Sequence, residues 1–150
     1  MDYLTSDPIE PSLLVQWVEA PDRGAIATFL GTVRDHHAGR TVVELQYEAF
    51  GPMAEAECGR IVAEAESRWP CRIALRHRIG RLVIGDVVVA VAAASAHRDE
   101  AFTACRYVIE ELKRRVPIWK RERYADGTEA WVDPTAPGGT VPAAVAEPAR

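Results

Sequence analysis

Apolar and polar positions follow two different periods along this chain, and the two periods predict both strands and helices. Strand-forming residues dominate residues 25–33 and 42–49. Residues 72–79 alternate between polar and apolar side chains, which predicts a strand with one solvent-exposed face. Residues 87–94, within VIGDVVVAVAAA, are almost entirely apolar and predict a buried strand.

Apolar residues recur at spacings of three and four in two longer segments, which predicts two main helices. The first covers residues 52–68 and ends before Pro70. The second covers residues 97–116 and ends there because Pro117 disfavours α geometry in the residue before it. A shorter helix is expected over residues 12–19. The residues predicted to be buried on these helices are Met53, Ala54, Ile61, Val62, Ala65, Trp69, Phe102, Cys105, Ile109, Leu112, Leu13, Leu14 and Trp17.

The connections between these elements predict an α+β domain with antiparallel strands. Residues 118–124 and 129–132 flank an Asp-Gly pair, which is a strong signal for a hairpin. The strands at 25–33 and 42–49 are expected to form another antiparallel pair across a polar loop at 35–40. Strands, helices and hairpins alternate irregularly, as in α+β folds.

Length and composition indicate one domain. The chain has 150 residues, and its hydrophobic content of 48% is enough for a core. We expect residues 1–132 to form the domain, with residues 1–22 as an arm and short helix. Proline, glycine and alanine dominate residues 133–150, which predicts a flexible tail. No signal peptide and no membrane-spanning run is seen in the sequence, and we expect a cytoplasmic protein.

Charge and cysteine content exclude several classes of function. The net charge of -4 argues against general nucleic-acid binding, although cations concentrate at residues 113–123. The three cysteines are scattered, which predicts reduced thiols, with neither a disulfide framework nor a zinc site. The chain lacks a Gly-rich phosphate loop and a nucleophile elbow of the GxSxG type. His36 and His37 are adjacent and are expected in a surface loop, and His77 on the solvent face of its strand.

Five cationic residues at the ends of predicted elements are the remaining candidates for chemistry. Together they suit a doubly anionic ligand, because a helix N-terminus that carries cationic side chains binds anions. A lysine near other cations can have a depressed pKa and act as a base or nucleophile. Spacing alone leaves open the alternative that these side chains are solvated surface charges. The five residues are Arg34, His97, Arg98, Lys113 and Lys120.

Four segments in a fixed order resemble the large, catalytic subunit of molybdopterin synthase. They are FLGTVRDHHAGRTVVELQYEAFGPMAE, RIVAEAESRWP, HRIGRLVIGDVVVAVAAASAHRDEAF, and LKRRVPIWKRE followed by WV. The most specific set is SAHR, a helix that ends in LK, and then a proline and WKRE. The resemblance covers roughly residues 24–132.

The resemblance implies an α/β hammerhead fold and a sulfurtransferase. Members of this family convert cyclic pyranopterin monophosphate to the dithiolene of molybdopterin, in molybdenum cofactor biosynthesis. The sulfur comes from a C-terminal Gly-Gly thiocarboxylate on a small ubiquitin-like partner subunit. A homodimer of large subunits binds one small subunit at each outer end, which makes a heterotetramer. The resemblance implies no cofactor and no bound metal.

By matching motifs, the resemblance places catalytic lysines at Lys113 and Lys120 and substrate-binding residues at Arg34, His97 and Arg98. The sequence does not divide the roles of the two lysines. Asp35 is a departure, because family members often have asparagine after the first-strand arginine. Two other classes stay open, a non-catalytic anion-binding scaffold and a small RNA-binding domain, although retention of both lysines favours the enzyme.

The predicted helix also indicates how the site is assembled. Arg98 and Lys113 are separated by fifteen residues, or roughly 20 Å at the rise of an α-helix. A pterin monophosphate is too short to contact both ends. We therefore expect His97 and Arg98 to reach the site from a neighbouring protomer of a two-fold dimer.

Overall fold

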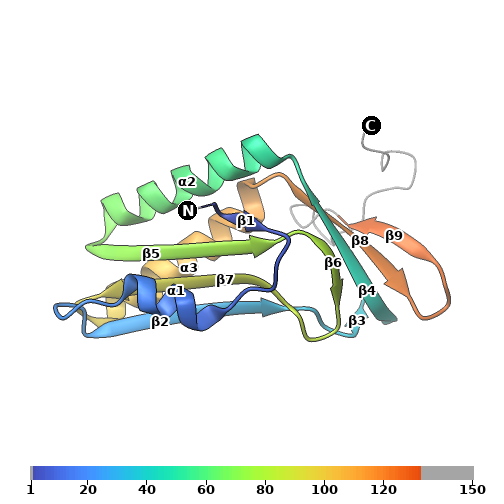
Figure 1. Cartoon of the computed structure of the whole chain (residues 1–150), viewed down its shortest axis with the longest axis horizontal. Helices are drawn as coiled ribbons and strands as arrows, with labels where there is room; N and C mark the ends of the chain where they lie inside the picture. The colour runs from blue at the N-terminus through green and yellow to red at the C-terminus, as the bar shows by residue number, and fades with distance from the viewer. Residues whose placement is uncertain (1, 133–150) are drawn as a thin grey trace.

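The computed structural model describes residues 2–132, and within them the chain forms nine strands, three helices and two sheets (Figure 1). This is a mixed α/β fold, as the α+β pattern predicted. The predicted flexible tail at residues 133–150 lies outside the described residues. Within the described part, no helix is long and apolar enough to cross a membrane.

The first sheet is built around the apolar strand that the sequence predicted. Strand β7 (Val87–Ser95) lies between β2 (Ala25–Thr32) and β5 (Cys71–Arg78) and pairs antiparallel with both. The two-residue strand β1 (Leu4–Thr5) adds to β5 in parallel. All of β7 after Val87 is buried, which confirms the prediction of a buried strand.

Helices cover both faces of this sheet. Helices α2 (Gly51–Arg68) and α3 (Arg98–Arg115) pack on one face, and the shorter α1 (Pro11–Val18) packs on the other (Figure 1). Pro70 and Pro117 follow the ends of α2 and α3, as predicted. The sheet and its helices therefore form three layers.

The second sheet is antiparallel and lies beyond one end of the first. Its strands are β3 (His36–His37), β4 (Arg40–Ala49), β6 (Gly80–Val83), β8 (Ile118–Tyr124) and β9 (Glu129–Val132). Strand β4 pairs with β3, β6 and β8, and β8 also pairs with β9. The predicted hairpin between β8 and β9 is confirmed, with Gly127 at a φ of 86° in its turn.

The predicted pairing of residues 25–33 with 42–49 is wrong. Strand β2 pairs with β7 in the first sheet, whereas β4 belongs to the second sheet. The chain crosses between sheets at Val33, whose N–H donates to the Asp86 carbonyl at 3.0 Å. The polar loop predicted between these strands does contain a turn. This turn closes the short β3–β4 hairpin, and Gly39 in it has a φ of 76°.

The helix faces were predicted less well than the helix ends. Met53, Phe102, Leu13 and Trp17 are exposed, and Phe102 keeps 67% of its surface. The other residues predicted to be buried on α2 and α3 are buried, apart from the half-buried Trp69, so the prediction misplaced mainly the face of α1. The buried sets are Leu14 and Val18 on α1; Ala54, Cys58, Ile61, Val62 and Ala65 on α2; and Ala101, Ala104, Cys105, Val108, Ile109 and Leu112 on α3.

The prediction that His77 faces solvent is also wrong. His77 has the same parity on β5 as Ile73 and Leu75, which face α2 and α3, because alternate residues of a strand share a face. The side chain is 5% exposed and meets the Tyr47 ring edge-on at 5.3 Å. Its Nδ1 lies 2.8 Å from the Arg78 carbonyl oxygen. Burial lowers the pKa of His77 to about 4, and Lys113 acts in the same direction.

Two leucines test the assignment of buried faces. Leu75 is 1% exposed and Leu13 is 59% exposed. We expect Leu75→Ala to lower the free energy of unfolding by about 2–5 kcal/mol, since it leaves a cavity. Leu13→Ala should change it by about 0.5 kcal/mol or less. Denaturant unfolding of both variants measures the difference, and equal losses would contradict the orientation of α1.

The burial of His77 predicts a pH dependence of stability. Because the folded-state pKa is depressed to about 4, the unfolded chain binds the proton more readily at mildly acidic pH. The contribution of His77 is therefore fully present above about pH 6.5 and is lost as the pH falls to about 4. We expect wild type to lose about 3 kcal/mol more than His77→Gln over this interval. His36→Gln is the exposed control, and parallel curves for wild type and His77→Gln would contradict the burial.

Candidate functional site

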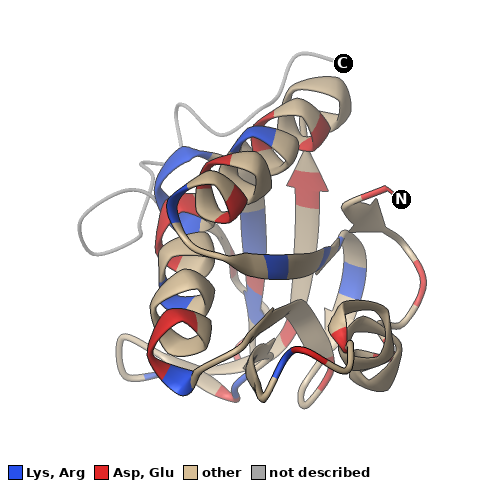
Figure 2. Cartoon of the chain, turned by 90° about the vertical axis from the view of Figure 1, so that its left-hand side faces the viewer, with Lys and Arg blue, Asp and Glu red and all other residues tan. Residues whose placement is uncertain are grey.

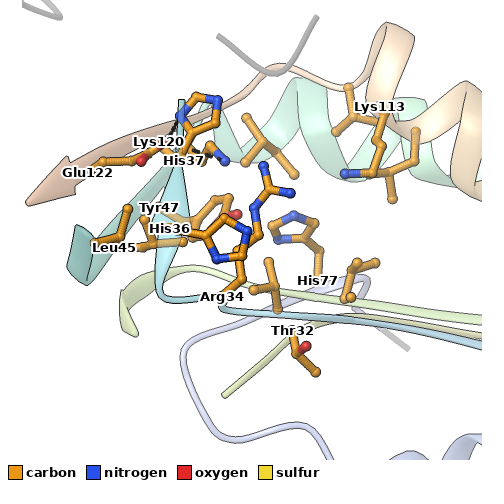
Figure 3. Close-up of a pocket in the computed structure, with 17 residues that line it drawn as sticks. Thr32, Arg34, His36, His37, Leu45, Tyr47, His77, Lys113, Lys120 and Glu122 are labelled. Carbon is orange, nitrogen blue, oxygen red and sulfur yellow. Dashed lines mark ion pairs between the residues drawn. The ribbon is translucent and has the colours of Figure 1, made fainter. Parts of the chain in front are cut away.

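A cavity of about 310 Å³ lies between the two sheets at the C-terminal end of α3. Residues from β2, β3, β4, β5, β7, β8 and α3 line it, together with Arg34, which follows β2. Lys120, His37 and Glu122 lie together on one side of the cavity, Lys113 lies on the other, and Arg34 and His77 lie between (Figure 3). Three of the five predicted site residues, Arg34, Lys113 and Lys120, therefore meet in one cavity.

Local features of the chain bring these side chains to the cavity. Strand β2 shifts register beside Gly31, where an added Cβ would lie 2.7 Å from Val89 Cγ1. Glycine thus permits a close approach of β2 to β7 just before Arg34. Lys113 lies in the last turn of α3, and Pro117 then turns the chain into β8. Lys120 faces inward from β8, in register with Tyr47 of β4.

A cluster of ion pairs holds the end of α3 against α2. Arg115 Nε lies 2.6 Å from Glu57 Oε1, and Arg115 Nη1 lies 2.6 Å from Glu64 Oε2. Glu111 contributes a third contact at 3.2 Å. Acidic and basic residues occur along both helices (Figure 2). Hydrogen bonds from Arg115 and Tyr107 lower the pKa of Glu64 to about 2. The cluster fixes the helical turn that carries Lys113.

The cavity is electropositive, and opposing influences act on the pKa of Lys120 within it. Burial lowers the pKa of Lys120, and the charges of Lys113 and Arg34 act in the same direction. Glu122 opposes them and raises it. An amine in such surroundings can bind an anion when protonated and take up a proton when neutral. The arrangement suits an anionic substrate whose reaction involves proton or acyl transfer.

Lys113 and Lys120 are the only two lysines of the chain, and the other basic residues among its 18 Lys and Arg are arginines. Arginine cannot be deprotonated in proteins, whereas lysine becomes a base or nucleophile when its pKa falls. Both side-chain amines of the chain, those of Lys113 and Lys120, therefore lie in one cavity. This signal is present in the sequence, and it separates the two lysines from the surrounding surface charges.

The structure does not bring His97 and Arg98 to this cavity within one chain. His97 occupies the N-cap position of α3 without a capping hydrogen bond from its side chain, and Arg98 is the first residue of the helix. Lys113 follows Arg98 by fifteen residues on this helix, which separates Arg98 from the cavity by about 22 Å. This separation agrees with the distance expected from the sequence.

Sequence reasoning missed five ionisable residues that line the cavity. His37, expected in a surface loop, contacts Glu122, whereas His36 is exposed as expected. The missed residues are His36, His37, Tyr47, His77 and Glu122. Alternation along β5 and β8 could have found His77 and Glu122, because they share faces with buried neighbours. Within residues 2–132, no group of His, Cys, Asp or Glu is arranged to hold a metal ion.

The three cysteines are free, which confirms that they form no disulfide. Burial raises the pKa of the Cys58 thiol to about 12, and those of Cys71 and Cys105 to about 11. None of them lines the cavity. They are therefore neutral thiols at physiological pH and lie away from the two lysines.

Comparison with known proteins identifies the family. The family model described as MoaE protein matches residues 4–115. The molybdopterin synthase catalytic subunit of Halalkalibacterium halodurans is 45% identical over 130 residues, which cover 86% of this chain and 83% of that protein. The Bacillus subtilis protein of the same name is 44% identical over 130 residues, 86% of this chain and 82% of its own. The crystal structure of molybdopterin synthase from Staphylococcus aureus superposes with a TM-score of 0.82 at 36% identity, over 87% of this chain and 95% of that one. The chain belongs to the MoaE protein family.

Proposed function

We propose that this protein is the catalytic subunit of a molybdopterin synthase. It transfers sulfur from the C-terminal thiocarboxylate of a small ubiquitin-like subunit to cyclic pyranopterin monophosphate, which forms the molybdopterin dithiolene. The observation that carries the proposal is the meeting of Lys113, Lys120 and Arg34 in one cavity. The names of the relatives support the same activity. The fold is then of the α/β hammerhead type.

The cavity supplies what both reactants need. The cyclic phosphate and the thiocarboxylate are anions, and a partly enclosed cationic cavity interacts with them more strongly than exposed charges would. Arg34 binds the phosphate, since its guanidinium offers a planar set of donors. Lys113 assists sulfur addition, by proton transfer or by accepting the acyl group transiently. Lys120 holds the thiocarboxylate or stabilises negative charge as it develops.

The same proposal requires a dimer, and strand β2 offers the surface for it. One edge of β2 pairs with β7, and the other edge pairs with no strand within the described residues. The strand AIATFLGT has no charge and no proline, the features that normally protect an edge from pairing. Ile26 and Leu30 on it are exposed at 37% and 44%. We propose that β2 pairs antiparallel with its own copy across a two-fold axis.

This pairing would complete the site. Ala25 at the start of β2 pairs with Ser95, which lies two residues before His97. Thr32 at the other end lies two residues before Arg34. Antiparallel pairing of two copies places the start of one β2 beside the end of the other. The His97 and Arg98 side chains of each chain would then reach the cavity of its partner and add two donors for the phosphate.

Reconstitution tests the activity directly. Purified protein is mixed with thiocarboxylated small subunit and cyclic pyranopterin monophosphate, and molybdopterin is detected as its oxidised fluorescent derivative. Formation of the fluorescent derivative in an amount that increases with reaction time supports the proposal. Absence of product with folded protein and active small subunit would refute it.

Variants at Lys113 distinguish an amine from a positive charge. We expect Lys113→Ala and Lys113→Arg to lower the rate of molybdopterin formation by about 100-fold or more, since arginine keeps the charge but cannot transfer the proton or the acyl group. Arg114→Ala, at the exposed next position, is the matched control and should stay within about twofold. Activity of Lys113→Arg near wild type would show that charge alone is needed there.

Complementation tests the shared site. Arg98→Ala and Lys113→Ala proteins, each inactive alone, are mixed in equal amounts and allowed to exchange subunits. Half of the dimers are then mixed, and one of the two sites in each mixed dimer is intact. We expect about a quarter of wild-type activity to return. If subunit exchange is verified and no activity returns, the site lies within one chain.

A further inference from the structure

A buried carboxylate lies in the wall of this cationic cavity. Glu122 is 1% exposed, and neither of its carboxylate oxygens has a hydrogen bond of normal geometry. Burial of a charged carboxylate without partners is unfavourable, so such a group is expected to interact with nearby cations. In a cavity that binds anions, a negative charge would otherwise weaken binding. Its presence therefore requires a role other than contact with the anion.

Two basic side chains approach Glu122 from different strands. Lys120 precedes it by two residues on β8 and shares its face, and Lys120 Nζ lies 3.7 Å from Oε1. His37, on β3, places Nδ1 2.8 Å from the same oxygen. This contact is attractive when Nδ1 carries a proton. One carboxylate oxygen thus lies close to two basic side chains that are exposed to similar extents, 22% for Lys120 and 20% for His37 (Figure 3).

The other groups around Lys120 do not oppose its deprotonation. Arg34 and Lys113 disfavour a third positive charge in the cavity. His77 on β5 is buried and neutral above about pH 4. Burial raises the pKa of Tyr47 on β4, so that phenol is neutral. Tyr124 on β8 also has a raised pKa and lies under the Arg40 guanidinium. Glu122 is the carboxylate among the residues that line the cavity.

We propose that Glu122 is a positioning residue that holds Lys120 in the cavity as an ammonium, and that His37 competes with Lys120 for the same carboxylate. The consequence for the reaction rests on the proposed function. While Glu122 interacts with Lys120, the ammonium of Lys120 binds the anionic reactant. When His37 interacts with Glu122 instead, Lys120 releases its proton more readily. His37 thereby becomes a residue of the sulfur-transfer site, although it need not contact the reactants.

The scarcity of lysine makes a direct test possible. A chain of this sequence has three amines, at Lys113, at Lys120 and at its N-terminus. Trace labelling with acetic anhydride, read by peptide mass spectrometry, reports the fraction of each amine that is unprotonated. The N-terminal amine serves as the internal reference. The measurement needs neither substrate nor partner.

We expect Glu122→Gln to raise the labelling rate of Lys120 relative to the N-terminus by about tenfold at pH 7.5, which corresponds to a pKa lower by about one unit. Lys113 should change less. Glu44→Gln is the matched control, since Glu44 is a half-buried glutamate of β4 that pairs with Arg81 and Arg123 outside the cavity. An unchanged or slower rate for Lys120 in folded Glu122→Gln protein overturns the proposal.

His37→Ala tests the competition and does not depend on the folding of the Glu122 variant. Removal of His37 leaves the carboxylate to Lys120, so we expect slower labelling of Lys120, by about twofold or more at pH 7.5. His36→Ala is the control, because His36 is exposed and contacts Asp35. The same labelling rate of Lys120 in wild type and in His37→Ala overturns the role of His37. If reconstitution yields no molybdopterin but the labelling rates change as expected, the proposed function is refuted. The interaction between Glu122 and Lys120 is supported in that case.

Discussion

The burial of β7 on both faces is the constraint on which the rest of the structure depends. Ala90, Ala92 and Ala94 face α1, while Val89, Val91 and Ala93 face α2 and α3. Small side chains let helices pack closely on both sides, and antiparallel pairing fixes β2 and β5 against it. The two ends of this strand determine where the candidate residues lie. Val87 marks the end at which the cavity opens, and Ser95 leads to His97 and Arg98, so one strand separates the two groups of cations.

The sequence predicted local structure well because local structure has local causes. Pro70 and Pro117 ended their helices, and the Asp-Gly turn closed its hairpin where expected. The pairing of strands was harder to predict from the sequence, because β2 and β4 are close in sequence but belong to different sheets. Their separation depends on how the chain around Val33 packs against Asp86 from a distant segment. The buried face of α1 was misplaced because Leu13 and Trp17 have the same spacing as the buried pair Leu14 and Val18.

Some residues of the candidate site could be predicted from the sequence, and others could not. Motif resemblance identified Arg34, Lys113 and Lys120, and the structure brings them together. Alternation along β8 places Glu122 on the face of Lys120, so the sequence contained that relation as well. His37 was out of reach, because its contact with Glu122 joins β3 to β8, two strands that do not pair with each other. A residue of this kind can be found only when the second sheet is assembled.

The restriction of lysine to the cavity has a consequence for a protein whose proposed partner carries a reactive acyl terminus. Activated acyl groups are lost to primary amines, with which they form stable amides, whereas a guanidinium stays protonated and does not attack them. The outer surface of this chain obtains its positive charge from arginine. A partner that docks in a wrong orientation therefore meets no lysine there and can leave unchanged. The amino-acid composition of the chain thus disfavours acylation of side chains outside the cavity, independently of the contacts within the site.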